Sequence, residues 1–423
     1  MLDINFIRNN SETVKQAAKN KLIDVDIDRL LFLDAEIRKN TVDIDLLRNE
    51  RNSLSKLNKN ESPGEKEKSA EKVKKIKQVL TEKETCLENS RKEFNQLMLN
   101  VPSVTAPEVP VGKDESDNVE IKRRGDIPEF DFAPKDHMEL AESLDLIDMP
   151  RAVKFAGSRA YFLKNEGMLL ELAVCRYVLD KLVSKGFVPM SVPCMVRDTA
   201  MQGTGYFPVG YDQSYKLQED NLFLIGTSEV PLISYHQNET LDYAELPKKY
   251  AGYSTCFRRE AGAAGKDTRG IYRVHQFQKI EQLIICRNDI KEAEDLHYQI
   301  LNNVEEILQN LKLPYRVALA CTGEIGIGQI RKHEIETWMP SRQNYCETHS
   351  CSTMGDFQAR RSNIKYRDID GSTKFVFTLN NTGIASPRIL IPILENYQQK
   401  DGSVLIPDVL QPYMNGQKII SPT

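Results

Sequence analysis

Two runs of apolar residues at three- and four-residue steps fill residues 26–101, and they constrain the fold more than any other feature. One proline and one glycine, Pro63 and Gly64, lie between the runs. A heptad seam on each side of a Pro-Gly turn predicts two helices that pack as an antiparallel coiled coil. Each helix would span ~30 residues, or about 45 Å, so we expect the hairpin to project. The seam residues are Leu30, Leu33, Ile37, Ile44, Leu47 and Leu54, then Val73, Ile76, Leu80, Leu87, Phe94 and Leu97.

A projecting coiled coil is most often a partner-binding arm or a spacer. The second helix begins with a lysine-rich segment that could contact phosphates along a nucleic acid. The alternative is that these lysines form an ordinary solvated face. The residues concerned are Lys66, Lys68, Lys72, Lys74, Lys75 and Lys77.

The overall composition predicts a multidomain protein, and we expect the cytoplasm as its location by default. A length of 423 residues predicts two or three domains, and the formal net charge of −4 means that nucleic-acid binding must rest on local basic patches. The eight cysteines include no C-x-x-C pair, so we expect reduced thiols and no zinc site. We find neither a signal peptide nor an apolar run of ~20 residues, and so predict no membrane span.

The C-terminal two thirds have a mixed pattern of strand-like and helical runs. Neither G-x-G-x-x-G after a strand nor G-x-x-x-x-G-K-[ST] occurs, which disfavours the two common parallel-sheet nucleotide folds. We therefore predict an α+β fold in which helices flank an antiparallel sheet.

Residues 257–281, FRREAGAAGKDTRGIYRVHQFQKIE, carry the clearest chemical signal. The pattern predicts a strand, a long flexible loop and a returning strand. Guanidinium groups such as that of Arg258 bind phosphate bidentately, and an aromatic face such as that of Phe277 can stack on a base. This combination suits phosphoryl or nucleotidyl transfer, whereas the residues alone are equally compatible with a hairpin that has a solvated basic tip.

The same segment resembles motif 2 of the class II aminoacyl-tRNA synthetases in its seryl-tRNA synthetase form, F-R-x-E-A-G followed by R-G-L-x-R-x-H-Q-F-x-K-V-E. The resemblance implies an N-terminal tRNA-binding arm over residues 1–105 with a coiled coil at about 27–100, a linker at 106–130, and a catalytic domain at 131–423. It also implies a homodimer. Pro193 takes the position of the motif 1 proline, although prolines also end strands for simpler reasons.

The resemblance further implies an ATP site with bound Mg²⁺. Arg258 and Arg388 would bind the phosphates, with Arg388 and Phe277 stacking on opposite faces of adenine. In CETHSCSTMGDFQARR, Glu347 and Ser350 take the Mg²⁺-binding positions, and Arg258, Arg388 and Glu347 are the expected catalytic residues. The full implied ATP site is Arg258, Arg259, Glu260, Val274, Phe277, Glu347, Thr348, His349, Ser350 and Arg388.

A serine pocket is implied by resemblance to a T-A-E loop and to motif 3, N-G-S-G-L-A-x-G-R. Its residues are Thr227, Ser228, Glu229, Arg258, Glu281, Asn380 and Thr382. A pocket built to hydrogen-bond a hydroxyl rejects alanine because its polar groups would be left unpaired. Four positions depart from the family pattern, namely Ser228, His349, Thr382 and Pro387. The loop-tip residues Lys266, Asp267 and Arg269 are candidates for contact with the acceptor stem, or form a solvent-facing tip.

The implied reaction converts L-serine and ATP into seryl-adenylate and then charges tRNA(Ser), and tRNA(Sec) where the host has one. The sequence argues against two other interpretations. An amino-acid ligase that loads a carrier protein would not need the arm, and a catalytically retired paralogue would not need the intact arginines and glutamates of the motifs.

Overall fold

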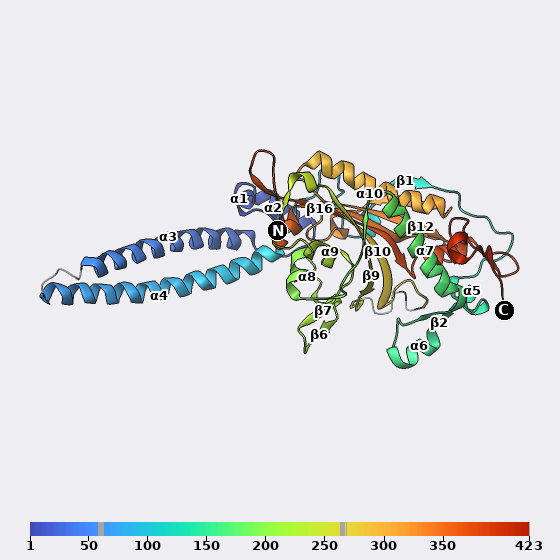
Figure 1. The fold of residues 1–423 in the computed structure, drawn as a ribbon, viewed down its shortest axis with the longest axis horizontal. Helices are drawn as coiled ribbons and strands as arrows, with labels where there is room; N and C mark the ends of the chain where they lie inside the picture. Colours follow the sequence, from blue (N-terminus) through green and yellow to red (C-terminus); the bar gives the residue numbers. More distant parts are fainter. Residues whose placement is uncertain (58–62, 263–266, 268, 423) are drawn as a thin grey trace. The chain divides into compact units, whose positions relative to one another are not determined.

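The computed structural model describes residues 1–57, 63–262, 267 and 269–422 (Figure 1). This part of the chain divides into two compact units. One consists of Leu2–Lys19 and Ile23–Pro102, and the other of Met1, Asn20–Leu22 and Ser103–Thr423. The predicted α+β class is confirmed, because the first unit is helical and the second contains the sheets.

The described residues of the helical unit form two short and two long helices. These are α1 (Ile4–Asn9), α2 (Ser11–Asn20), α3 (Ile27–Leu57) and α4 (Pro63–Asn100). The prediction that Pro63 and Gly64 form a turn is wrong, because both residues belong to α4. Proline is well tolerated at the first position of a helix, where its missing N–H would have no helical acceptor. Residues 58–62, which connect α3 to α4, lie outside the described part.

The predicted seam forms the core between α3 and α4. Ile44, Ile76, Leu80 and Leu87 are buried there. Polar interruptions of the seam are paired across the two helices: the Ser90 hydroxyl donates to Glu36 Oε2 at 2.9 Å, and Lys83 Nζ donates to Asp43 Oδ2 at 2.7 Å. The coiled coil is therefore confirmed, and its polar positions fix the pairing of the helices rather than interrupting it. The predicted lysine face from Lys68 to Lys77 is exposed, while the side chain of Lys66 lies outside the described residues.

The second unit is built around an eight-stranded sheet of order β1-β11-β12-β13-β16-β10-β9-β4. All neighbouring strands are antiparallel except β4 and β9, which run parallel. The strands are β1 (Val119–Arg124), β4 (Val188–Ser191), β9 (Lys248–Phe257), β10 (Gln276–Cys286), β11 (Tyr315–Leu319), β12 (Arg331–Met339), β13 (Asn344–Gly355) and β16 (Phe377–Ser386).

Two long helices, α7 (Asn165–Ser184) and α10 (Ile290–Asn310), pack against the central strands of this sheet. Their apolar faces join one large core cluster with β10 and β16. The Ile300 carbonyl of α10 accepts hydrogen bonds from Gln282 Nε2 of β10 at 3.3 Å and from Asn381 Nδ2 of β16 at 2.7 Å. Residues on that face of β10 are therefore committed to the core, which leaves the alternate residues available for a site.

Shorter elements complete the unit. The helices are α5 (His137–Ser143), α6 (Met149–Ala156), α8 (Asp198–Thr204), α9 (Glu229–Ser234), α11 (Phe357–Ser362) and α12 (Leu390–Asn396). The small sheets contain β2 (Ile147–Asp148), β3 (Phe162–Leu163), β5 (Met195–Val196), β6 (Lys216–Leu217), β7 (Leu222–Leu224), β8 (Thr240–Asp242), β14 (Lys365–Arg367), β15 (Thr373–Phe375), β17 (Val404–Leu405) and β18 (Ile419–Ile420).

The segment predicted as a linker, residues 106–130, contributes directly to the sheet. Its strand β1 pairs with β11, so the segment belongs to the second unit. Among the described residues, none of the helices has the length and apolarity needed to cross a membrane.

Candidate active site

Strands β9 and β10 carry the first site residues at the ends where they approach the loop. The Arg258 N–H donates to the His275 carbonyl at 3.0 Å, which extends the pairing of the two strands beyond Phe257 and Gln276. The Arg258 guanidinium lies 5.3 Å from the centre of the Phe277 ring. The aromatic side chain and the cation predicted to bind a nucleotide are therefore adjacent.

A cleft with about 610 Å³ of empty space lies beside these residues. Its lining contains four cationic side chains and two carboxylates, so it favours an anionic ligand. The lining residues are Arg258, Glu260, Ile271, Tyr272, Arg273, Val274, Phe277, Lys279, Glu347, Thr348, His349, Ser350, Thr382, Ala385, Ser386, Pro387 and Arg388.

A bulge in β13 explains how Glu347 and Ser350 both line the cleft. Side chains three positions apart point to opposite faces of a regular strand. Here Ile335 pairs with His349 while Glu336 pairs with Glu347, which leaves one extra residue, Thr348, in β13. A bulge of this kind reverses the alternation of side chains and re-aims them locally.

Arg388 is held at the edge of the cleft by Tyr272 and Glu347. Its guanidinium lies 4.5 Å from the centre of the Tyr272 ring, its Nε donates to the Tyr272 carbonyl at 3.2 Å, and its Nη1 donates to the Glu347 carbonyl at 3.2 Å. Nη1 also lies 3.5 Å from Glu347 Oε2. Burial disfavours the charged form of Glu347, but Lys332, Arg388, Arg258 and Lys279 outweigh it and lower the pKa of the carboxyl. Glu347 is therefore ionised at neutral pH.

His349 stays neutral in this cationic surrounding. Burial lowers its pKa to about 3; the Glu347 carboxylate opposes this shift, and Arg388 and Lys279 each add a smaller effect in the same direction as burial. Its Nδ1 lies 2.9 Å from the Thr348 hydroxyl, and its Nε2 is buried without a hydrogen-bond partner among the described residues. The histidine that replaces a family serine thus contributes a neutral imidazole to the cleft lining.

Most of the residues predicted to bind serine form a buried polar cluster, called here the serine cluster. Lys279 pairs with Glu281, and Lys279 Nζ also donates to Thr227 Oγ1 at 3.3 Å. Asn380 Nδ2 donates to Glu229 Oε1 at 2.8 Å, and the Glu229 N–H donates to Thr227 Oγ1 at 3.3 Å. Such a network can present carboxylate and hydroxyl oxygens to a small polar ligand.

The carboxyl group of Glu229 in this cluster has a raised pKa. Burial raises its pKa, and the neighbouring Glu281 carboxylate raises it further. Hydrogen bonding by Gln358 and the charges of Lys279 and Arg258 oppose the rise, and the net pKa is about 7. A carboxyl poised in this way gains charge readily when a cation binds beside it.

Two of the predicted residues neither line the cleft nor hydrogen-bond within the serine cluster. Arg259 is exposed, and its Nη1 donates to the Asp212 carbonyl at 3.2 Å. Ser228 is fully buried, and its hydroxyl donates to the Gly252 carbonyl of β9 at 3.1 Å. The extra hydroxyl at position 228 therefore has a structural partner.

Glu260 lines the cleft but is paired with Arg273, whose Nη1 donates to Glu260 Oε2 at 2.9 Å. The backbone of Glu260 has a φ of 53°, a left-handed conformation that costs of order 1 kcal/mol or more for a residue other than glycine. Residues held in this way are concentrated at functional sites.

Seven lining residues were not predicted from the sequence as site residues, namely Ile271, Tyr272, Arg273, Lys279, Ala385, Ser386 and Pro387. Lys279 could have been found from strand periodicity, because Phe277, Lys279 and Glu281 alternate along β10. Tyr272 and Arg273 lie between the loop and β10, where no local periodicity indicates which way a side chain points.

The described loop-tip residues make contacts within the unit. Asp267 accepts a hydrogen bond from Arg342 at 2.7 Å, and Arg269 lies 3.2 Å from Asp136. Lys266, the third residue predicted to contact the acceptor stem, lies outside the described residues.

The donor set fits a magnesium ion better than a softer metal. Glu347 and Ser350 offer a carboxylate and a hydroxyl oxygen, the hard ligands that Mg²⁺ prefers, and the remaining positions would be left to phosphate and water oxygens. No group of three or more His, Cys, Asp or Glu residues suited to hold a metal occurs among the residues that the structure describes.

Arg258, in the strand–loop–strand segment of the sheet, and Arg388, just before α12, both lie in the part of the chain that identifies it as a class II aminoacyl-tRNA synthetase. The model of the tRNA synthetase class II core domain (G, H, P, S and T) matches residues 213–397. At the level of fold alone, a Giardia lamblia prolyl-tRNA synthetase superposes with a TM-score of 0.57 at 15% identity, covering 65% of this chain and 55% of that chain.

The particular family follows from the helical unit and from similar relatives. The model of the seryl-tRNA synthetase N-terminal domain matches residues 1–105. A serine–tRNA ligase of Deinococcus radiodurans is 45% identical over 99% of both chains. The crystal structure of seryl-tRNA synthetase from Pyrococcus horikoshii complexed with ATP has a TM-score of 0.92 at 40% identity, with full coverage of both chains. This chain belongs to the seryl-tRNA synthetase family.

Proposed function

We propose that this chain activates L-serine with ATP to seryl-adenylate and then transfers serine to tRNA(Ser). The observation that carries the proposal is the cationic cleft, in which Arg258, Phe277, Glu347 and Arg388 meet. Lys279 links this cleft to the serine cluster, because it lines the cleft and also donates to the Thr227 hydroxyl. A phosphate-binding compartment beside a group of hydroxyl and carboxylate oxygens suits the two substrates of this reaction.

In the first step the serine carboxylate attacks the α-phosphorus of ATP, a new C–O–P bond forms, and pyrophosphate leaves. The substrate supplies its own nucleophile, so the protein contributes position and charge. Arg258 would bind the α-phosphate and the serine carboxylate. Arg388 would bind the γ-phosphate and stack on adenine opposite Phe277, and Glu260 would accept from the adenine amino group once freed from Arg273. Glu347 and Ser350 would hold Mg²⁺, which would supply positive charge to the triphosphate.

In the second step a ribose hydroxyl of the terminal adenosine attacks the carbonyl carbon of serine, and AMP leaves. The long helices α3 and α4 would grip the long variable arm of the tRNA, with exposed lysines such as Lys72 and Lys75 near phosphates. We extend the proposal to tRNA(Sec), to a cytoplasmic homodimer, and to an arm that serves the cleft of the partner subunit.

The test is pyrophosphate exchange with each of the twenty amino acids, followed by charging of total tRNA. Serine-dependent exchange and charging are expected. An absence of exchange would indicate a retired paralogue, and exchange without charging would indicate a ligase that loads a carrier protein.

Deletion of residues 28–97 separates the two steps. Because the lining residues of the cleft all belong to the second unit, the shortened enzyme should retain exchange and lose charging. Charging that survives the deletion would contradict the role proposed for the arm.

A further inference from the structure

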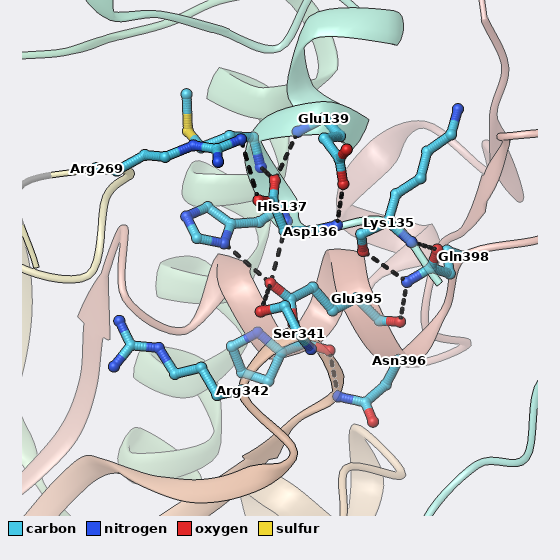
Figure 2. A network of polar contacts seen from close by, with 12 residues as sticks. Lys135, Asp136, His137, Glu139, Arg269, Ser341, Arg342, Glu395, Asn396 and Gln398 are labelled. Atoms are coloured by element: carbon cyan, nitrogen blue, oxygen red, sulfur yellow. Dashed lines mark hydrogen bonds and ion pairs between the residues drawn. The ribbon is translucent and has the colours of Figure 1, made fainter. Parts of the chain in front are cut away.

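A buried carboxylate, that of Glu395, lies outside the cleft at the far end of the helix that follows Arg388. The side chain is fully buried in α12. Its two oxygens accept four hydrogen bonds: from the His137 N–H at 3.0 Å, from His137 Nδ1 at 2.9 Å, from the Ser341 N–H at 2.9 Å and from the Ser341 hydroxyl at 2.8 Å. Figure 2 shows His137 and Ser341 converging on this carboxylate.

These bonds join three segments that are far apart in the sequence. His137 opens α5, Ser341 lies in the turn between β12 and β13, and Glu395 lies near the end of α12. A buried carboxylate without its donors is costly, and a buried donor without its acceptor costs about 1–3 kcal/mol. The three segments are therefore fixed to one another by a single side chain.

One branch of this network leads to the nucleotide-binding side of the cleft. Ser341 is followed by Arg342, whose guanidinium lies 4.2 Å from the centre of the Tyr272 ring. The same ring carries the Arg388 guanidinium at 4.5 Å. The position of Ser341 thus influences the position of the aromatic ring that supports Arg388.

The other branch leads to the stem of the loop between β9 and β10. The His137 imidazole packs so closely against Gly270 that a Cβ atom on this residue would lie 2.3 Å from His137 Nε2. The adjacent residues Asp136 and Arg269 lie 3.2 Å apart as an ion pair, which Figure 2 also shows. Gly270 has a φ of 86°, so both space and backbone conformation call for glycine here.

We propose that Glu395 is a positioning residue for ATP: through Ser341 and His137 it holds Tyr272, Arg388 and the loop stem in the arrangement that binds the triphosphate. Glu395 does not line the cleft, and its carboxylate bonds to His137 and Ser341 rather than to the serine cluster. The inference rests on the proposed ATP-dependent activation, and it predicts an effect on ATP that is separate from any effect on serine.

The test compares Glu395→Gln with a matched control, Glu305→Gln, in serine-dependent pyrophosphate exchange. Glu305 is also a buried carboxylate, which accepts from the Tyr315 hydroxyl at 2.9 Å and pairs with Lys122 at 2.7 Å, but it does not line the cleft or join this network. Both variants replace a buried carboxyl group by an amide, so a general loss of stability should affect both. Thermal unfolding sets an assay temperature at which both remain folded.

We expect Glu395→Gln to raise the KM for ATP about tenfold, with the KM for serine changed by less than about twofold. Glu305→Gln should leave both values within about twofold of the wild type. An unchanged KM for ATP in Glu395→Gln, or equal changes for ATP and serine, would overturn the proposal. Exchange by the wild-type enzyme in the same assay tests the proposed activity separately.

A milder variant covers the case in which Glu395→Gln does not fold. Ser341→Ala removes one of the four hydrogen bonds and leaves the carboxylate with the other three. We expect a rise of about threefold in the KM for ATP with the KM for serine unchanged, since a single hydrogen bond contributes only modestly. A Ser341→Ala enzyme with wild-type ATP kinetics would contradict the proposal.

Discussion

The pKa of Glu229 leads to a quantitative prediction for serine binding. Burial and the neighbouring Glu281 carboxylate raise this pKa to about 7. If the serine ammonium group pairs with Glu229, only the ionised form binds serine well. The apparent KM for serine should then scale as 1 + 10^(pKa − pH), which gives an increase of about tenfold from pH 8 to pH 6.

The assay is pyrophosphate exchange at saturating ATP over this pH range, with Glu229→Gln as the comparison. The amide of this variant cannot ionise, so the variant should have a higher KM for serine at pH 8 and little change of KM with pH. A KM for serine that stays constant from pH 8 to pH 6 in the wild type, or that changes equally in the variant, would refute the assignment.

Folding stability offers an independent check of the same pKa. Because the pKa of Glu229 is higher in the folded protein than in the unfolded chain, its stabilising contribution is fully present below about pH 4.5 and is lost as the pH rises through about 7. Relative to the wild type, Glu229→Gln should therefore gain about 3 kcal/mol in the free energy of unfolding between pH 4 and pH 8. Urea unfolding at both pH values measures this difference.

Two further predictions concern the triphosphate. Arg388→Lys keeps the charge but loses the planar group that stacks on Tyr272 and donates to two carbonyls. We expect kcat/KM for ATP to fall roughly 10²-fold in exchange assays. A change below about threefold would argue against the role of Arg388. Glu347→Gln should raise the Mg²⁺ concentration needed for half-maximal exchange by about tenfold or more. Chelation of Mg²⁺ should abolish exchange in the wild type and in the variant. An unchanged Mg²⁺ requirement would exclude Glu347 as a ligand.

The site residues that belong to short contiguous motifs could be predicted from the sequence. Arg258, Phe277, Glu347 and Arg388 lie in three such motifs, and the structure brings all of them to one cleft. The roles of neighbouring residues were harder to predict from the sequence. Nothing local indicates that Arg259 bonds to Asp212 outside the cleft while Arg273, beyond the loop, enters the lining.

The bulge formed by the extra residue Thr348 is another feature that could not be predicted from the sequence. The bulge depends on how β13 pairs with β12, and pairing is a property of two strands rather than of one. The placement of Glu347 and Ser350 on one cleft therefore follows from the family motif but could not be derived from strand alternation, which would separate them.

By itself the sequence determined the helical hairpin, the alternation of the β-strands and the motifs that identify the family. These are local signals, since apolar spacing decides which face of a helix or strand is buried whatever lies opposite. Only the tertiary structure decided that residues 106–130 supply the edge strand β1, that Ser228 bonds to β9, and that Glu395 joins α5 to the β12–β13 turn. Each depends on contacts between distant segments, whose free energy is set by packing and hydrogen bonding in the assembled fold.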